Sequence, residues 1–489
     1  MNVKVQKRVK KEEGLLIVPF FKEYIKTFPK EYTDELKSLV KRALKKKEFE
    51  GNGNESQYYT IDAKALPEKV LFIGCGKKEK YDSKRARILG AEICAEAKEK
   101  KQQKVIVLLL EEMNLYIGEL VESIVLKNYR ISKYKTGEDF EKERKRDVKE
   151  LVLITNKTEK AEKEAEKALI IARATNITKD LVNGPANIVN AEYFEKIAKE
   201  ISRDYKVLVL NKDKLIKQGW GGLLSVNQGA YANPKCVIIE YHGGKRNSEP
   251  IVIVGKGIIF DSGGYNLKPT QHIEYMHSDK AGASAVIGIF MALKQLGIKQ
   301  NVIGIMPLTE NMIDGKAFRP SDIITMLNGK TVEITNTDAE GRLILGDGLT
   351  YGLKYKPKYL IDIATLTGAA MIALGDRYSA LFANDKILKE RLLDAGERTD
   401  DVLWELPLHK DHKEIMKSQV ADLRNGDTGT SHLAGASKGA AFLVNFIDKS
   451  KWAHIDIAGT GYTKDPKKYE QMGATGAGVR LLLEFLEKL

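Results

Sequence analysis

Asn336-Thr337-Asp338-Ala339-Glu340-Gly341-Arg342 places two carboxylates and a guanidinium within five positions. Residues 332–335 before it favour the end of a β-strand, and residues 343–345 after it favour the start of a helix. In an open α/β sheet, ligands bind beyond the carboxyl ends of the strands. Two carboxylates this close repel each other unless a cation lies between them. The alternative is a solvated loop, and residues further upstream decide between the two interpretations.

Residues 251–264 read Ile-Val-Ile-Val-Gly-Lys-Gly-Ile-Ile-Phe-Asp-Ser-Gly-Gly, an apolar strand followed by Lys256, Asp261 and a glycine turn. The apolar neighbours of Lys256 predict burial, which lowers the pKa of a lysine and allows a neutral amine to ligate a metal. Nucleotide binding is excluded, because Phe260 stands where GxGxxG needs its third glycine and no GxxxxGK[ST] is present.

Two further charged residues, Lys268 and Asp279, follow this strand. Asp279 directly precedes the small-residue run 281–284, where it would also serve as a helix N-cap. Carboxylates at such turns, together with nearby cations, can hold two divalent metal ions roughly 3.5–4 Å apart. Oxygen ligands with a lysine amine suit Zn²⁺, Mn²⁺ or Mg²⁺. The candidate set is Lys256, Asp261, Lys268, Asp279, Asp338, Glu340 and Arg342.

Length and composition indicate a globular protein of more than one domain. The chain has 489 residues, of which 43% are hydrophobic and 30% are charged, so we expect two domains. Its three cysteines form no CxxC pair, which favours a reducing compartment and argues against structural zinc. The apolar run 15–21 is short and contains Pro19, and no stretch approaches the roughly 20 apolar residues of a membrane span. We therefore expect a cytoplasmic protein.

Positive charge is concentrated near the N-terminus. Residues 1–150 carry 35 lysines and arginines against 26 acidic residues, which accounts for +9 of the net charge of +13. A nucleic-acid partner is therefore possible. The alternative is a solvated surface rich in lysine and glutamate, and aromatic residues do not alternate with the basic runs as in single-strand binders.

Alternating apolar strands and helices predict an α/β fold with two domains. We expect a smaller N-terminal α/β domain over residues 1–156, a connecting helix over 157–177 and a larger C-terminal α/β domain over 178–489. Continuous apolar runs predict a mostly parallel central sheet flanked by helices in the larger domain. Its expected strands are 207–210, 237–241, 251–254, 302–306, 360–364 and 454–457, and its expected helices are 283–296, 343–353 and 436–447.

The chain resembles the leucyl (cytosol) aminopeptidases, which are two-metal exopeptidases. The resemblance covers about residues 178–485 and is carried by NTDAEGRL at 336–343 and VGKGIIFDSGG at 254–264. Supporting stretches are DLVNGPAN at 180–187, ATLTGA at 364–369, WAHIDIAGT at 452–460 and GATG at 473–476. The resemblance implies a metal-dependent leucyl aminopeptidase that hydrolyses the N-terminal peptide bond of peptides, in a homohexamer.

The resemblance also implies a role for each site residue. Asp261 and Glu340 would bridge two metals, Mn²⁺ or Zn²⁺, Lys256 and Asp279 would complete the tighter site, and Asp338 would complete the more exchangeable one. Lys268 would polarise the scissile carbonyl, and Arg342 would hold a bicarbonate that relays a proton. The residues implied to line the pocket for the substrate's first side chain are Met276, Thr365, Gly368 and Ala458.

The sequence departs from the family's usual Asp-Met-Gly-Gly-Ala-Ala after the ligand aspartate, since Lys280 and Ala281 follow Asp279 here. Lys280 would either lower metal affinity or point to solvent, and Ala281 would stiffen or shift the turn. His432 we assign to a surface or helix-start position. Two rival functions remain, a DNA-binding accessory role of the basic N-terminal domain and a different two-metal hydrolase such as a phosphoesterase.

Overall fold

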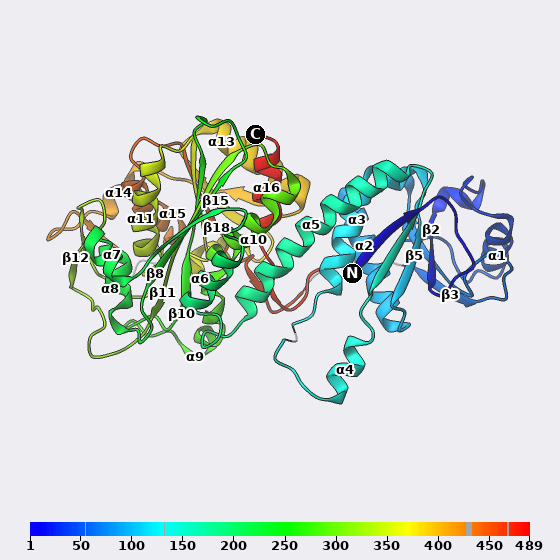
Figure 1. Cartoon of the computed structure of the whole chain (residues 1–489), viewed down its shortest axis with the longest axis horizontal. Coiled ribbons are helices and arrows are strands. Elements are labelled where there is room, and N and C mark those ends of the chain that lie inside the picture. Colours follow the sequence, from blue (N-terminus) through cyan, green and yellow to red (C-terminus); the bar gives the residue numbers. More distant parts are fainter. Residues whose placement is uncertain (54, 132, 427–432, 467–468) are drawn as a thin grey trace. The chain divides into compact units, whose positions relative to one another are not determined.

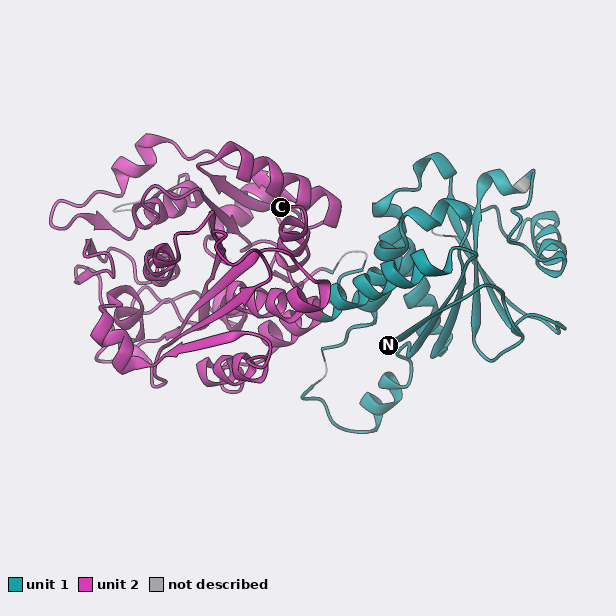
Figure 2. Ribbon diagram, turned by 45° about the horizontal axis from the view of Figure 1, so that its top comes forward, with its two compact units in different colours: residues 1–173, 466–471 teal, residues 174–465, 472–489 magenta. Residues whose placement is uncertain are grey.

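The structure is a computed structural model of the chain, and it describes residues 1–53, 55–131, 133–426, 433–466 and 469–489. His432 lies outside these ranges. The chain forms two compact units, one of residues 1–173 and 466–471 and one of residues 174–465 and 472–489 (Figure 2). Both are α/β, which confirms the predicted fold class. The domain boundaries drawn from the sequence stay predictions.

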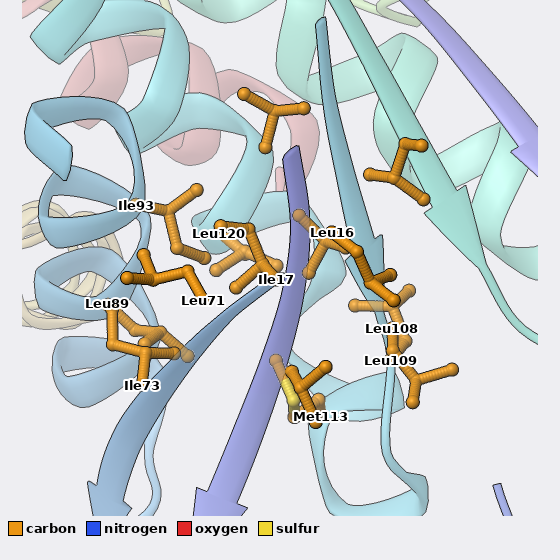
Figure 3. Packing of buried hydrophobic residues seen from close by; sticks show 14 of the residues in the cluster. Leu16, Ile17, Leu71, Ile73, Leu89, Ile93, Leu108, Leu109, Met113 and Leu120 are labelled. Atoms are coloured by element: carbon orange, nitrogen blue, oxygen red, sulfur yellow. The ribbon is translucent and has the colours of Figure 1, made fainter. Parts of the chain in front are cut away.

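The first unit contains a sheet with the strand order β1-β6-β5-β2-β4-β3, in which all neighbours are parallel except β3 and β4. Helices α2 and α3 pack against each other, and Figure 3 shows their leucine and isoleucine side chains meeting those of β2 and β4. The strands are β1 (Asn2–Gln6), β2 (Leu15–Phe21), β3 (Ser56–Thr60), β4 (Lys69–Gly76), β5 (Lys104–Leu108) and β6 (Glu150–Ile154). The helices are α1 (Asp34–Lys45), α2 (Ser83–Glu99), α3 (Ile117–Asn128) and α4 (Glu138–Arg144).

The apolar run 15–21, for which no strand is predicted, forms β2, a fully buried inner strand. Proline removes a ladder donor and is therefore unexpected inside a sheet. Pro19 lies beyond the pairing of β2 with β5, which covers Leu15 to Ile17, and is paired on one side only, opposite Ile73 of β4. Its carbonyl accepts a hydrogen bond of 2.5 Å from the Tyr32 hydroxyl.

The second unit contains a larger sheet with the order β16-β15-β18-β14-β9-β11-β8-β7, and β10 pairs with β11. Its central strands β18, β14, β9 and β11 are parallel, as predicted, whereas β8 and the β15–β16 pair run against them, and the edge strand β7 is antiparallel to β8. The strands are β7 (Lys206–Leu210), β8 (Lys235–His242), β9 (Ile251–Gly255), β10 (Gly257–Asp261), β11 (Asn301–Asn311), β14 (Tyr359–Ala364), β15 (Ser379–Ala383), β16 (Leu403–Glu405) and β18 (Trp452–Asp456).

Helices cover both faces of this sheet (Figure 1). Helix α10 packs on β9, β11 and β14 together with α16, while α11 packs on the same strands with α8 and α15. The main helices are α5 (Thr158–Asn183), α6 (Ala191–Glu200), α7 (Lys212–Gln218), α8 (Gly221–Val226), α9 (Thr270–Ile273), α10 (Ala281–Leu296), α11 (Gly341–Gly352), α12 (Gly368–Leu374), α13 (Lys386–Thr399), α14 (Lys410–Ile415), α15 (Gly435–Leu443) and α16 (Val479–Glu487).

The NTDAEGR segment lies between a strand and a helix, as predicted, but the strand is not part of the central sheet. It follows β13 (Thr331–Glu333), which belongs to a small sheet with β12 (Ile323–Thr325) and β17 (Leu423–Arg424). The segment then enters α11, whose close packing on β9 explains a glycine in its interior. A Cβ on Gly348 would lie 2.7 Å from Cγ1 of Val254.

No helix within the described ranges combines the length and the apolar character that a membrane span requires.

Candidate active site

Three carboxylates that lie far apart in the sequence come together in the second unit. Asp261 ends β10, and Asp338 and Glu340 lie between β13 and α11. One oxygen of each lies within 4.8 Å of the others, an arrangement that can hold a metal ion. Asp279 lies in η5 (Met276–Lys280), the 3₁₀ turn before α10. The structure therefore gathers the predicted carboxylates at one place.

Two lysines complete the cluster. The Lys256 ammonium lies 2.7 Å from Oδ2 of Asp279 and 3.0 Å from Oε1 of Glu340. The Lys268 ammonium lies 2.9 Å from Oδ2 of Asp261 and 2.6 Å from Oδ1 of Asp338. Each lysine thus bridges two carboxylates of different chain segments.

Exposure separates the two halves of the cluster. The side chains of Lys256, Asp279 and Glu340 are 3%, 6% and 2% exposed, whereas that of Asp338 is 31% exposed. The half built on Asp338 therefore opens to solvent, and the half built on Lys256 is enclosed.

Burial and neighbouring negative charges raise the pKa of the carboxylates above their ordinary values. Burial raises the pKa of Asp279 to about 8 and that of Asp338 to about 7, and the neighbouring Asp261 and Glu340 add to both shifts. Burial, followed by the charge of Asp261, also raises the pKa of Glu340. Crowded carboxylates of this kind favour a bound cation.

Lys256 differs from the prediction made for it. Burial does act to lower its pKa, but Asp279, Glu340 and Asp261 outweigh that effect and hold the pKa above its ordinary value. The lysine is therefore an ammonium in this arrangement, and ligation of a metal by its amine requires loss of that proton.

Glycines allow the segments to approach so closely. After Asp261, Gly263 and Gly264 have φ of 88° and 62°, which side-chain-bearing residues rarely adopt. A Cβ on Gly341 would lie 2.5 Å from Cε of Lys256. A side chain at position 341 would therefore displace the end of Lys256 from its place between Asp279 and Glu340.

Two asparagines outside the predicted set of site residues support the site. Asn311 is fully buried at the end of β11, and its amide donates to Oδ1 of Asp261 at 2.8 Å and to the Thr337 carbonyl at 3.0 Å. The Asn425 side chain accepts from the backbone N–H of Thr335 at 2.8 Å and donates to the Asn336 carbonyl at 2.6 Å. A polar residue at the end of an apolar strand was the signal available for Asn311, and nothing local distinguishes Asn425 from a turn residue.

Arg342 is half-buried, and its Nη1 donates to the Asn425 carbonyl at 2.8 Å. Its Nε is a buried donor without a hydrogen-bond acceptor in the part of the chain that the structure describes. Burial lowers its pKa somewhat, with Glu340 and Asp456 acting in the opposite direction. A small anion would satisfy such a guanidinium.

The four residues implied to line a substrate pocket lie on four different segments of the second unit. Thr365 follows β14, its hydroxyl donates to Oδ1 of Asp279 at 2.7 Å, and its carbonyl accepts from Lys256 at 2.9 Å. Ala458 follows β18, the strand paired with β14, and its N–H donates to Asp456 at 3.1 Å. Gly368 begins α12 with open space where a Cβ would stand. Met276 shares η5 with Asp279.

The departure after Asp279 is accommodated without strain. Ala281 has φ of −60° and ψ of −37°, which suits any residue in a helix. Lys280 does not point to solvent, because it is fully buried and donates to the carbonyls of Gly184 and His277 at 2.8 and 2.5 Å. Burial lowers the pKa of Lys280 to about 7.

The residues present fit divalent metal ions. Oε2 of Glu340 is buried without a hydrogen-bond donor among the described residues, and carboxylate oxygens are the ligands that hard divalent cations prefer. Lys256, Asp261, Asp279, Asp338 and Glu340 are the groups that would hold them.

Comparison with known proteins gives a family for both units. The catalytic domain of the Cytosol aminopeptidase family matches residues 176–483, and the N-terminal domain of that family matches residues 17–138. A probable cytosol aminopeptidase of Geotalea uraniireducens (strain Rf4) is 37% identical over an alignment of 481 positions that covers 95% of each protein. Another, of Protochlamydia amoebophila (strain UWE25), is 37% identical over 501 residues, 100% of this chain and 98% of the relative.

Among solved structures, the bottromycin maturation enzyme BotP superposes with a TM-score of 0.84 at 28% identity, covering 98% of this chain and 99% of BotP. The same enzyme in complex with Mn superposes with a TM-score of 0.83 over the same coverage.

Proposed function

The chain belongs to the cytosol aminopeptidase family and is an aminopeptidase, and from that premise we propose that it is a two-metal enzyme that removes leucine-like residues from the N-terminus of peptides. The observation that carries this proposal is the convergence of Asp261, Asp338 and Glu340 within 4.8 Å, with Lys256 and Lys268 bridging them. The Mn in a structure of the similar enzyme BotP supports Mn²⁺ as one of the metals.

Two divalent ions at this cluster would supply Lewis acidity and would lower the pKa of a bound water to near neutrality. The protein's own groups do the rest. Lys268 lies at the more open half, where its ammonium would hold the scissile carbonyl and stabilise the developing oxyanion. The carboxylates around it would favour a substrate with a free α-amine, which restricts cleavage to the first peptide bond.

Arg342 would bind bicarbonate through its half-buried guanidinium, where the anion would serve to accept the proton that the attacking water loses. This role is consistent with the Nε of Arg342, a buried donor that finds no hydrogen-bond acceptor among the described residues. It also accounts for a site in which no histidine is needed as general base.

The preference for leucine-like residues rests on Met276, Thr365, Gly368 and Ala458, which would line the pocket. Hydrolysis of a panel of amino-acid p-nitroanilides tests it, with leucine expected to give a kcat/KM at least about tenfold above glycine and glutamate. A Gly368→Leu variant fills the open space beside Gly368 and is expected to shift the preference to small residues. An unchanged order of substrates in that variant would remove Gly368 from the pocket.

The rival functions are weaker. A phosphoesterase would cleave aryl phosphates in the presence of Mn²⁺, and the relatives named above are aminopeptidases. DNA binding gains no support from these comparisons. Several lysines of the first unit already pair with acidic residues, such as Lys4 with Glu150 and Lys104 with Glu12, at 2.9 and 2.8 Å.

We also propose a cytoplasmic homohexamer. The hexamer follows from the family resemblance, and the compartment is supported by three buried cysteines, none of which is in a disulfide among the described residues.

A further inference from the structure

Asp456 is a buried carboxylate of the second unit that the proposed reaction does not use. It ends β18 and lies opposite Ala364, the last residue of the parallel neighbour β14. The segments that leave the carboxyl ends of adjacent parallel strands are where an open α/β sheet forms its binding sites. Here these segments are residues 365–367 and 457–461, and both are hydrogen-bonded to the Asp456 carboxylate.

The carboxylate accepts several hydrogen bonds from the two segments. Oδ1 of Asp456 accepts from the backbone N–H groups of Leu366, Thr367 and Ala458, at 3.0, 3.4 and 3.1 Å. Oδ2 accepts from the Thr367 hydroxyl at 2.6 Å. Buried backbone N–H groups need an acceptor, and one side chain provides it for both segments, so their separation depends on that side chain.

Thr367 transmits this contact to α12. Its hydroxyl donates its one proton to Asp456 and accepts from the N–H of Ala370 at 3.2 Å, so it also caps the N-terminus of α12. The Thr367 methyl group faces α15, since a Cβ added at Gly439 would lie 3.1 Å from it. The direction of the hydroxyl, and with it the start of α12 at Gly368, therefore depends on Asp456.

The other end of α12 contacts the same segment after β18. A Cβ on Gly459 would lie 2.2 Å from the Gly375 carbonyl and 3.6 Å from Cα of Met371, so the two backbones are in direct contact. The turn after β18 thus holds both ends of α12, through Asp456 at one end and Gly459 at the other.

Three of the residues implied to line the substrate pocket adjoin these contacts. Thr365 and Gly368 flank the bonded pair 366–367 in the sequence, and Ala458 donates to Asp456 directly. One carboxylate therefore holds together the segments that would form three sides of the pocket.

We propose that Asp456 is a positioning residue that determines how well the enzyme distinguishes the first side chain of its substrates, because it fixes the separation of the segments after β14 and β18. It acts through Thr365, Gly368 and Ala458 rather than on the substrate itself. This inference rests on the proposed function. A pocket with fixed walls favours a side chain that fills it, whereas a pocket with movable walls separates large from small side chains poorly.

A purely structural role of Asp456 leads to a different expectation. Loss of contacts that only stabilise the fold lowers the amount of active enzyme and affects every substrate alike. The ratio of kcat/KM for two substrates does not depend on the concentration of active enzyme, so it changes only if the pocket itself changes.

The test is the ratio of kcat/KM for leucine p-nitroanilide to that for alanine p-nitroanilide, measured with the Mn²⁺-loaded protein. We expect Asp456→Asn to lower this ratio about three- to tenfold, mainly through a higher KM for the leucine substrate. Thr367→Val removes the hydroxyl and leaves Asp456 in place. It is expected to lower the ratio as well, and it serves if Asp456→Asn does not fold. Thr367→Ser keeps the hydroxyl and is expected to retain the ratio.

The matched control is Asp362→Asn. Asp362 is a fully buried carboxylate of β14 that accepts from Nε1 of Trp452 at 2.7 Å and lies 2.6 Å from Nδ1 of His454, so these contacts join β14 to β18 within the sheet. Its substitution is expected to lower the melting temperature without changing the ratio.

An unchanged ratio in the folded Asp456→Asn and Thr367→Val variants, or an equal fall in Asp362→Asn, would overturn the inference and leave the aminopeptidase function intact. If the protein with no substitution cleaved neither substrate, or cleaved both equally well, the proposed function itself would be overturned. The two failures are therefore distinguishable.

Discussion

At the scale of single residues, the site depends on side chains that support the carboxylates as much as on the carboxylates themselves. Asp261 is held from one side by Lys268 and from the other by the amide of Asn311 and the backbone N–H of Gly263. The motif residues were recognisable in the sequence because they cluster around glycine turns. Their supports were not, because Asn311 and Asn425 become neighbours of the site only through the fold.

Asn311→Ala removes the donor that orients Asp261 and leaves the Thr337 carbonyl without one. We expect Mn²⁺ affinity to fall about 10- to 100-fold and the free energy of unfolding to fall by about 1–3 kcal/mol. Metal titration and urea denaturation measure the two effects. The matched control is Asn384→Ala. It removes a side chain that is hydrogen-bonded to the Ser450 carbonyl and the Trp452 N–H, and it should leave metal affinity unchanged. Equal affinities of Asn311→Ala and the control would contradict the support assigned to Asn311.

At the scale of elements, helix α11 shows why some features could be predicted and others could not. Its position after the NTDAEGR segment follows from the apolar residues after Arg342. Its glycines lower helix propensity. Glycine is needed at position 348 because α11 packs closely on β9, and no local pattern in the sequence reveals that packing. Strand β2 was not predicted as a strand, because Pro19 argues against an inner strand. Only the structure shows that the pairing of β2 with β5 ends at Ile17, before Pro19.

Gly348→Ala is expected to destabilise the protein by about 1–3 kcal/mol, because the added methyl group would overlap Val254 and push α11 away from β9. Gly315→Ala is the control, since no atom lies within 4 Å of the Cβ it would add. Urea unfolding of both variants measures the difference. Equal stability of the two would show that α11 adjusts without cost.

Asp347 links α11 to the start of α8, because its carboxylate accepts from the N–H groups of Leu223 and Leu327 at 2.9 Å each. Burial raises its pKa from 3.8 to about 7. Between these values the folded state keeps a proton that the unfolded state releases, so the stability contributed by Asp347 falls as the pH rises through that window.

Comparison with Asp347→Asn isolates this contribution, since asparagine does not titrate. The free energy of unfolding of the unsubstituted protein, relative to Asp347→Asn, is expected to be higher near pH 4 than near pH 7.5. A difference that does not change with pH would mean that the N–H donors of Leu223 and Leu327 keep the pKa of Asp347 low.

At the scale of the whole molecule, the sequence sufficed for two α/β units and for a parallel centre of the larger sheet. It did not reveal that β8 pairs antiparallel with both β11 and the edge strand β7, because strand direction depends on connections rather than on composition. It also did not reveal that residues 466–471 belong with the first unit.

The proposed homohexamer predicts a particle of six times the chain mass of 54.7 kDa, which light scattering after size exclusion would measure. A monomer at micromolar concentration would contradict it. The nucleic-acid alternative predicts a salt-sensitive gel shift by residues 1–155, and the absence of any shift at low salt would remove it.

The central claim is that the cluster around Glu340 makes this chain a metal-dependent aminopeptidase. Its most direct test is hydrolysis of leucine p-nitroanilide and of its N-acetylated form by the unsubstituted protein and by Glu340→Ala, after chelation and with or without Mn²⁺. We predict cleavage of the free-amine substrate only, dependent on Mn²⁺ and lost by at least about 100-fold in the variant. No cleavage of either substrate by the Mn²⁺-loaded protein, or equal activity of Glu340→Ala, would contradict the claim.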